Sequence, residues 1–311
     1  MSANVETMFY VRQTPWHGLG VKVEEAPTSR KALELSGLDW NVIQKPIFTS
    51  DNELIPNYKV NLRETDNKTL GVVTDRYKIV QNQEAFAFTD ALLGEGVTYE
   101  TAGSLQDGKK VWLLAKLPER YKILGDYISP YLVFSNSHDG SGALKIALTP
   151  IRCVCQNTLN LAIHDAKRIW TTNHSGDITL KLKEAMKTLL LAEYYMKKLG
   201  DEAYVLSRKS LSDKKVLNFI EELIPLPDNP SKIQENNIDL LRTDLKLRYF
   251  EAPDLEYLPK TGWRFINAVS DFSTHVTPLR KTQNYKENLF SKTIDGKPII
   301  DKAYEMVESL A

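Results

Sequence analysis

Residues 97–117 read VTYETAGSLQDGKKVWLLAKL, in which two strand-like runs flank Asp107-Gly108. An Asp-Gly pair supplies the positive φ angles that a tight hairpin turn requires. The flanking runs, residues 97–105 and 110–117, are therefore predicted to be two antiparallel strands. This hairpin indicates that the first half of the chain is built around a β-sheet.

The sequence on both sides of this hairpin carries further strand signals and short helices. A helix is predicted over residues 30–36, ended by Gly37, and a second over residues 83–93, with Asn82 as its N-cap and Gly94 at its end. Residues 153–166 shift to helical spacing. Strands are predicted over residues 40–48, 58–63, 69–80, 131–135 and 143–148.

The sequence pattern changes at about Thr179. From there, apolar residues recur at spacings of three and four, which predicts an amphipathic helix. Further helices are predicted over residues 212–223, 238–247, 262–273 and 297–309. The fold class is therefore α+β, with an N-terminal mixed or antiparallel β-sheet core followed by a mostly helical C-terminal part. We expect a core domain over residues 1–178 and a mainly helical region over residues 179–311 packed on it.

The composition is that of a globular protein, with 42% apolar and 26% charged residues. Lys+Arg and Asp+Glu number 40 each, and this zero net charge argues against a uniformly basic DNA coat. No apolar run approaches the length of a membrane helix, and the N-terminus does not resemble a secretion signal. Two cysteines provide no disulfide framework. We therefore expect a cytoplasmic protein that does not bind membranes.

The sequence provides little support for catalysis. It contains no phosphate-binding glycine loop, no dinucleotide fingerprint and no G-x-S-x-G elbow. His138-Asp139 and His164-Asp165 leave metal binding open, although a polar turn at His138 and a solvated helix end at His164 are favoured. Cys153 and Cys155 have no second cysteine pair with which to complete a tetrahedral site, so buried thiols are favoured. We expect no cofactor, no catalytic metal and no enzymatic activity.

Local charge is more informative than the total. Residues 143–198 contain nine basic and four acidic residues, so the stretch carries about +5. Trp170 lies within this stretch, and Tyr131 and Phe134 lie shortly before it in the sequence. Cations beside aromatic rings suit a groove that follows phosphates and stacks bases, whereas an ordinary solvated helix face with core aromatics is the alternative.

Six short motifs, in this order along the chain, resemble the domain of unknown function 932 family, also described as phage/plasmid-like proteins. The resemblance extends from about Trp16 to about Lys302. The motifs are residues 15–20 (PWHGLG), 38–40 (LDW), 73–82 (VTDRYKIVQN), 135–141 (SNSHDGS), 149–159 (TPIRCVCQNTL) and 262–271 (GWRFINAVSD). We expect a structural role for Trp16, Gly18 and Gly20 and a functional surface at the polar motif residues.

The resemblance implies a phage, prophage or plasmid context, hence a bacterial cytoplasm. The strand–strand–helix–strand–strand order of residues 58–117 is similar to the core of phage annealing proteins. The leading hypothesis is a non-enzymatic, oligomeric protein that binds single-stranded DNA during recombination or replication. The alternatives are an inhibitor that binds a host defence protein and a metal-dependent hydrolase using His17, His138 and Asp139. The candidate DNA-binding residues are Asn136, His138, Lys145, Arg152, Gln156, Asn157, Lys167 and Arg168.

Overall fold

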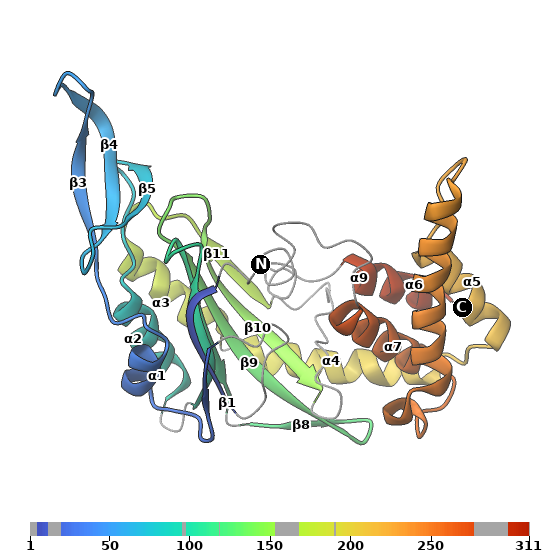
Figure 1. Cartoon of the computed structure of the whole chain (residues 1–311). Helices are drawn as coiled ribbons and strands as arrows, with labels where there is room; N and C mark the ends of the chain where they lie inside the picture. Colours follow the sequence, from blue (N-terminus) through green and yellow to red (C-terminus); the bar gives the residue numbers. More distant parts are fainter. Residues whose placement is uncertain are drawn as a thin grey trace. The chain divides into compact units, whose positions relative to one another are not determined.

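The computed structural model describes residues 5–11, 20–94, 98–117, 119–152, 168–189, 191–276 and 298–310 (Figure 1). The chain divides into two compact units. The first comprises Met1–Glu119, Tyr131–Leu148 and Arg168–Ala192, and the second comprises Arg120–Pro130, Thr149–Lys167 and Glu193–Ala311. The first unit is mainly β-sheet and the second mainly helical, so the predicted α+β class is confirmed.

The larger sheet has eight described strands in the order β11-β10-β9-β7-β6-β1-β2, and β8 pairs with β9. β1 and β2 run parallel, whereas β1–β6, β6–β7, β7–β9, β8–β9 and β10–β11 are antiparallel pairs. The strands are β1 (Val5–Val11), β2 (Val21–Val23), β6 (Thr98–Leu105), β7 (Lys110–Lys116), β8 (Tyr121–Ile123), β9 (Asp126–Ser137), β10 (Leu144–Arg152) and β11 (Ile169–Thr172).

The β6–β7 hairpin confirms the turn predicted from Asp107-Gly108. Gln106, Asp107 and Gly108 all have positive φ angles, of 53°, 61° and 85°. Strand β1, which lies between β6 and the edge strand β2, carries adjacent buried residues, Met8 and Phe9, which are 5% and 0% exposed. A strand covered on both faces does not alternate apolar and polar residues, which is why the sequence did not predict β1.

A second sheet of three described strands has the order β3-β4-β5, formed by β3 (Val42–Phe48), β4 (Leu54–Arg63) and β5 (Thr69–Thr74). Figure 1 shows β3 and β4 as a long ribbon that extends away from the larger sheet of the same unit. β5 ends six residues before the predicted limit of its strand, because the chain turns where the Tyr77 amide bonds to the Thr74 carbonyl. The strand order of the annealing-type core is present, but its two hairpins belong to different sheets.

Two helices, α1 (Ser29–Leu35) and α2 (Asn82–Leu93), pack against each other and against β6 and β7. Gln81, not the predicted Asn82, is the N-cap of α2, and Glu84 accepts from the Gln81 amide at 2.7 Å. Asn82 is instead buried and bonds inside the fold. Gly94 ends the helix as predicted, with φ of 72°. The core under these helices includes Phe9, Trp40, Leu70, Phe86, Tyr99, Leu113 and Phe134.

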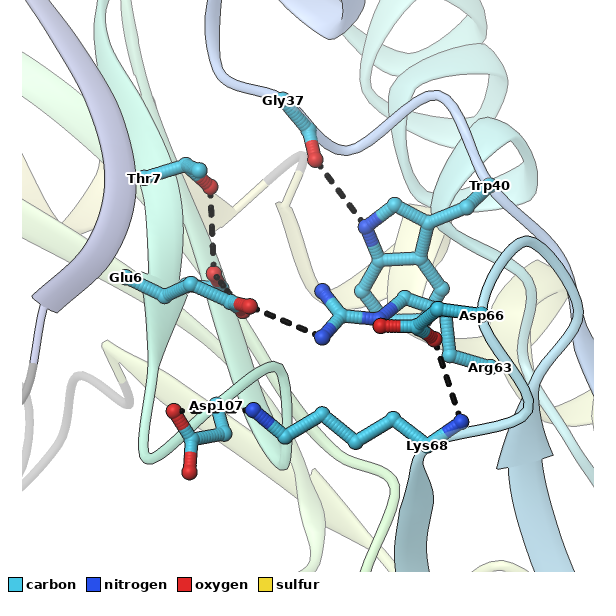
Figure 2. Close-up of polar contacts among 9 residues, drawn as sticks. Glu6, Thr7, Gly37, Trp40, Arg63, Asp66, Lys68 and Asp107 are labelled. Carbon is cyan, nitrogen blue, oxygen red and sulfur yellow. Dashed lines mark hydrogen bonds and ion pairs between the residues drawn. The ribbon is translucent and has the colours of Figure 1, made fainter.

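An ion-pair cluster joins both sheets of the first unit (Figure 2). Arg63 on β4 donates to Glu6 on β1 at 2.8 Å and to Asp66 at 3.1 Å. The Arg63 guanidinium also lies 5.3 Å from the ring centre of Trp40. The Ser104 hydroxyl on β6 donates to the second oxygen of Glu6. Since the Arg63 side chain is only 9% exposed, its charge is satisfied within the fold, and the cluster fixes β4 to β1 and β6.

The second unit contains α4 (Leu191–Arg208), α5 (Asp213–Leu223), α6 (Lys232–Glu251), α7 (Gly262–His275) and α9 (Pro298–Glu308), with a 3₁₀ turn, η1, at Pro253–Leu255. The helix predicted from Thr179 appears as α3 (Ile178–Leu189), in the first unit, and α4. α7 is central, since residues 262–270 are all buried. α6 begins six residues earlier than predicted because polar residues interrupt the helical period there. Within the described residues, no helix is both long and apolar enough to cross a membrane.

Candidate functional site

The candidate residues Asn136 and His138 lie inside the first unit, 1% and 0% exposed. The Asn136 amide donates to the Val80 carbonyl at 3.0 Å and accepts from the Ser137 amide at 2.9 Å. The expected surface position of these two residues is therefore corrected. Their polar groups are directed into the fold because they satisfy buried backbone and side-chain partners.

His138 is held by an amide of fixed orientation. The Asn82 NH₂ group donates to the carbonyls of Leu38 and Trp40, so its oxygen faces the His138 Nε2 at 3.0 Å. Nε2 therefore carries the proton, and the buried Nδ1 has no partner among the described residues. Burial, with a smaller effect from His174, lowers the pKa of His138 to about 3. The ring is neutral and packs edge-on against Trp40, with the ring centres 5.5 Å apart.

Three of the six sequence motifs meet in this network. Tyr77, from residues 73–82, donates its hydroxyl to the Ser137 carbonyl and stacks on His174, with the ring centres 4.6 Å apart. Two backbone-directed bonds fix His174 to Lys78: the Lys78 amide donates to the His174 carbonyl, and the His174 Nδ1 bonds to the Lys78 carbonyl. Burial raises the pKa of Tyr77 and lowers that of His174. The motifs therefore build a buried structural network.

The turn after His138 lies tightly against β5. A Cβ atom on Gly71 would lie 2.6 Å from the Asp139 Cα and 2.8 Å from its carbonyl oxygen. We expect Gly71→Ala to lower the free energy of unfolding by about 1–3 kcal/mol, because backbone atoms would have to move apart. Urea unfolding followed by tryptophan fluorescence measures this change. The exposed Thr69→Ala on the same strand is the control, and an equal effect of both substitutions would contradict the close approach.

Two of the candidate DNA-binding residues, Lys145 and Arg168, do not share one face. Lys145 on β10 lies opposite Thr171 on β11, and the Leu148 amide donates to the Arg168 carbonyl. Side chains alternate along a strand, so Lys145 and Arg168 point to opposite faces of the sheet. Both are partly exposed and have other interactions. The Arg152 side chain, Gln156, Asn157 and Lys167 lie outside the described residues, as do Trp16, Gly18 and both cysteines.

Another set of aromatic and basic residues is exposed on the second unit, and one of them, Lys198, belongs to the predicted basic stretch. Tyr194 and Tyr204 on α4 are 41% and 55% exposed, and each lies beside a cation four residues later. The Lys198 Nζ is 5.7 Å from the ring centre of Tyr194, and the Arg208 guanidinium carbon is 5.8 Å from that of Tyr204. The two tyrosines are ten residues apart, which corresponds to about 15 Å along the helix.

The β8–β9 hairpin of the same unit adds a third pair. Tyr127 is 52% exposed, and the Lys122 Nζ lies 6.0 Å from its ring centre. The hairpin neighbours α4, since a Cβ atom on Gly200 would lie 4.0 Å from the Ile123 side chain. We call these three pairs, Lys122, Tyr127, Tyr194, Lys198, Tyr204 and Arg208, the tyrosine–cation surface.

Residues 69–292 match the family described as Domain of unknown function (DUF932), which covers more than half of the chain. The chain belongs to this family. The DUF932 match includes Tyr77 and His138 of the buried network and all six residues of the tyrosine–cation surface. No curated protein and no solved structure matches the chain.

Within the described residues of this DUF932 chain, no three His, Cys, Asp or Glu side chains gather as a metal site would need.

The tyrosine–cation surface has a signal in the sequence that was not used to predict it. Tyr-x-x-x-Lys and Tyr-x-x-x-Arg occur ten residues apart within one amphipathic helix, and residues four apart lie on the same side of a helix.

Proposed function

We propose that the protein binds single-stranded DNA through the tyrosine–cation surface and supports recombination or replication of a phage, prophage or plasmid in the bacterial cytoplasm. The observation that carries this proposal is the pairing of each of three exposed tyrosine rings with a lysine or arginine. The rings offer faces on which bases stack, and the cations neutralise neighbouring phosphates. Such binding needs no nucleophile, metal or nucleotide.

The proposed contact is independent of base identity. Stacking accepts every base because each has a π-face, and phosphate contacts carry no base information. Lys198 and Arg208 are ten residues apart, so they are separated by about 15 Å along α4 and by roughly 80° around it. The expected strand therefore crosses α4 obliquely and reaches the β8–β9 hairpin near Gly200.

The double substitution Tyr194→Ala and Tyr204→Ala is expected to weaken binding to an oligothymidylate by about 30-fold or more, since each stacked base contributes roughly 1–3 kcal/mol. Fluorescence anisotropy of a labelled oligonucleotide measures the affinity. The matched phenylalanine substitutions keep the rings and should retain most of the binding.

Tyr58→Ala serves as the positional control, because Tyr58 is 48% exposed on β4 of the first unit. The proposal fails if the α4 double variant binds like the unaltered protein. Loss of binding in Tyr58→Ala alone would move the contact to β3–β5.

A second candidate function, inhibition of a host protein, is favoured by the exposed apolar residues of β3–β5. Phe48, Leu54, Tyr58 and Val72 are 51%, 59%, 48% and 55% exposed. Val60 lies opposite Val72, so Tyr58, Val60 and Val72 share one face of this small sheet. Exposed apolar patches of this kind are typical of protein contacts. A photo-crosslinker in place of Val72 should then capture one host protein, whereas the same probe in place of exposed Leu226 should not.

The hydrolase alternative gains no such support. Of its three residues, His138 is buried and bonded to Asn82, and His17 lies outside the described residues. Asp139 accepts hydrogen bonds from Ser137 and Ser141 within its own turn. Although burial raises the pKa of Asp139, these bonds outweigh it and lower the pKa. The Asp139 carboxylate therefore stabilises its own turn.

A further inference from the structure

The helix α6 carries an exposed aliphatic stripe with a period of seven. Ile233, Leu240 and Leu247 are 73%, 59% and 48% exposed, whereas Leu245 and Tyr249 on the other side of the helix are buried. The stripe extends over about 21 Å of helix. A seven-residue period is that of a seam between two paired helices, because 3.5 residues per turn keep the stripe facing its partner.

We propose that α6 pairs antiparallel with α6 of a second copy of this chain. The buried face of α6 is already occupied, since α6 packs on α5 and α7. The exposed face begins at the amino-terminal end, where residues 232–236 are all exposed. Figure 1 shows this end of α6 projecting past α9 of the same unit, so a second helix has access to it.

The charges beside the stripe select the partner and its direction. Asp239 and Lys246 flank Leu240 and Leu247, and within the described part of the chain neither has an ion-pair partner. When Leu240 of one copy packs beside Thr243 of the other in an antiparallel pair, Asp239 of each copy faces Lys246 of its mate. The same alignment brings Asn237 opposite Asp244. The helix therefore complements itself in this orientation.

A parallel pair would have the opposite electrostatics. In that alignment, Asp239 of one copy would face Asp244 of the other, and two like charges across a seam are unfavourable. Antiparallel helices also place each amino-terminal end beside a carboxy-terminal end, which their dipoles favour. Asn236 and Thr243 occupy the alternate positions of the seam. These polar layers limit its strength, so the expected dimer forms in roughly the micromolar range.

The test is sedimentation velocity of the full chain over a concentration series. We expect a reversible monomer–dimer equilibrium, with Leu240→Asp raising the dissociation constant at least tenfold. Leu226→Asp is the matched control, because Leu226 is an exposed leucine of the same unit outside the stripe. A monomer at all concentrations, or a dimer unaffected by Leu240→Asp, would overturn the proposal.

Charge exchange tests the orientation. Asp239→Lys and Lys246→Asp should each weaken the dimer, and the double variant should restore it, because each inverted ion pair is complete again. Asp239 is exposed and Lys246 partly exposed, so all three variants leave the buried face of α6 unaltered. A stronger dimer in Asp239→Lys alone would indicate a parallel pair and contradict the proposal.

Discussion

Replacing Arg264 by methionine is expected to lower the free energy of unfolding of the second unit by about 3–5 kcal/mol. Arg264 lies in the motif GWRFINAVSD and is 7% exposed. Its guanidinium donates to the carbonyls of Tyr249 at 2.9 Å, Leu258 at 2.8 Å and Phe250 at 3.5 Å. These carbonyls lie at the end of α6 and after η1, so the substitution leaves several buried acceptors without a donor.

Urea unfolding followed by circular dichroism at the helical signal measures this loss. Arg208→Met is the matched control, because Arg208 is exposed at the end of α4 and should change stability by less than about 1 kcal/mol. A stable Arg264→Met variant would mean that the carbonyls find water or other donors, and the structural role of this motif would have to be abandoned.

The stability of the first unit is expected to fall steeply between about pH 6.5 and pH 4. Burial lowers the pKa of His138 to about 3 in the folded protein, whereas an unfolded histidine titrates near 6.5. The unfolded chain therefore binds a proton that the folded chain does not, and acid favours unfolding. His138 therefore contributes about 1.4 kcal/mol per pH unit within this window. His174, whose pKa burial also lowers, adds to the same slope.

Urea unfolding at a series of pH values measures the slope, and His138→Asn isolates the contribution of this residue. The variant should be less stable at pH 7. The slope of its free energy of unfolding against pH should be smaller by about 1.4 kcal/mol per pH unit in this window, because unfolding takes up one proton fewer. Asp139, with its lowered pKa, affects stability only below about pH 4, so it does not obscure the window. An unchanged slope in His138→Asn would show that His138 is solvated in the folded protein.

The parts of the fold that the sequence predicted are those in which local chemistry decides the structure. Asp107-Gly108 requires positive φ angles, and Ser212, which accepts from the Lys215 amide, marks the start of α5. β1 and the first turns of α6 escaped prediction for opposite reasons. In β1 the adjacent residues Met8 and Phe9 are both buried, whereas residues 232–236 at the start of α6 are all exposed, and neither arrangement produces a periodic pattern.

The site was harder to predict because polarity alone does not reveal burial. Asn136 and His138 are residue types that are common in binding loops. Their hydrogen-bond partners, Val80 and Asn82, come from a distant segment of the chain. A hydrogen-bond network between segments some 56 residues apart has no local signature. The contact of Tyr194 with Lys198 could be predicted from their spacing of four residues on a helix. That the rings are exposed depended on which face of α4 packs inward, and only the structure determines that.

The salt dependence of binding tests the proposed DNA contact most directly. Lys122, Lys198 and Arg208 would neutralise three phosphates, so the logarithm of the affinity for an oligothymidylate should fall with the logarithm of salt at a slope of about −2. Replacing Lys198 and Arg208 by glutamine should reduce the slope to about −0.7. Anisotropy titrations of the intact protein between roughly 50 and 200 mM salt provide both values. A protein that does not bind at the lowest salt, or whose slope is the same with and without these two cations, would contradict the account.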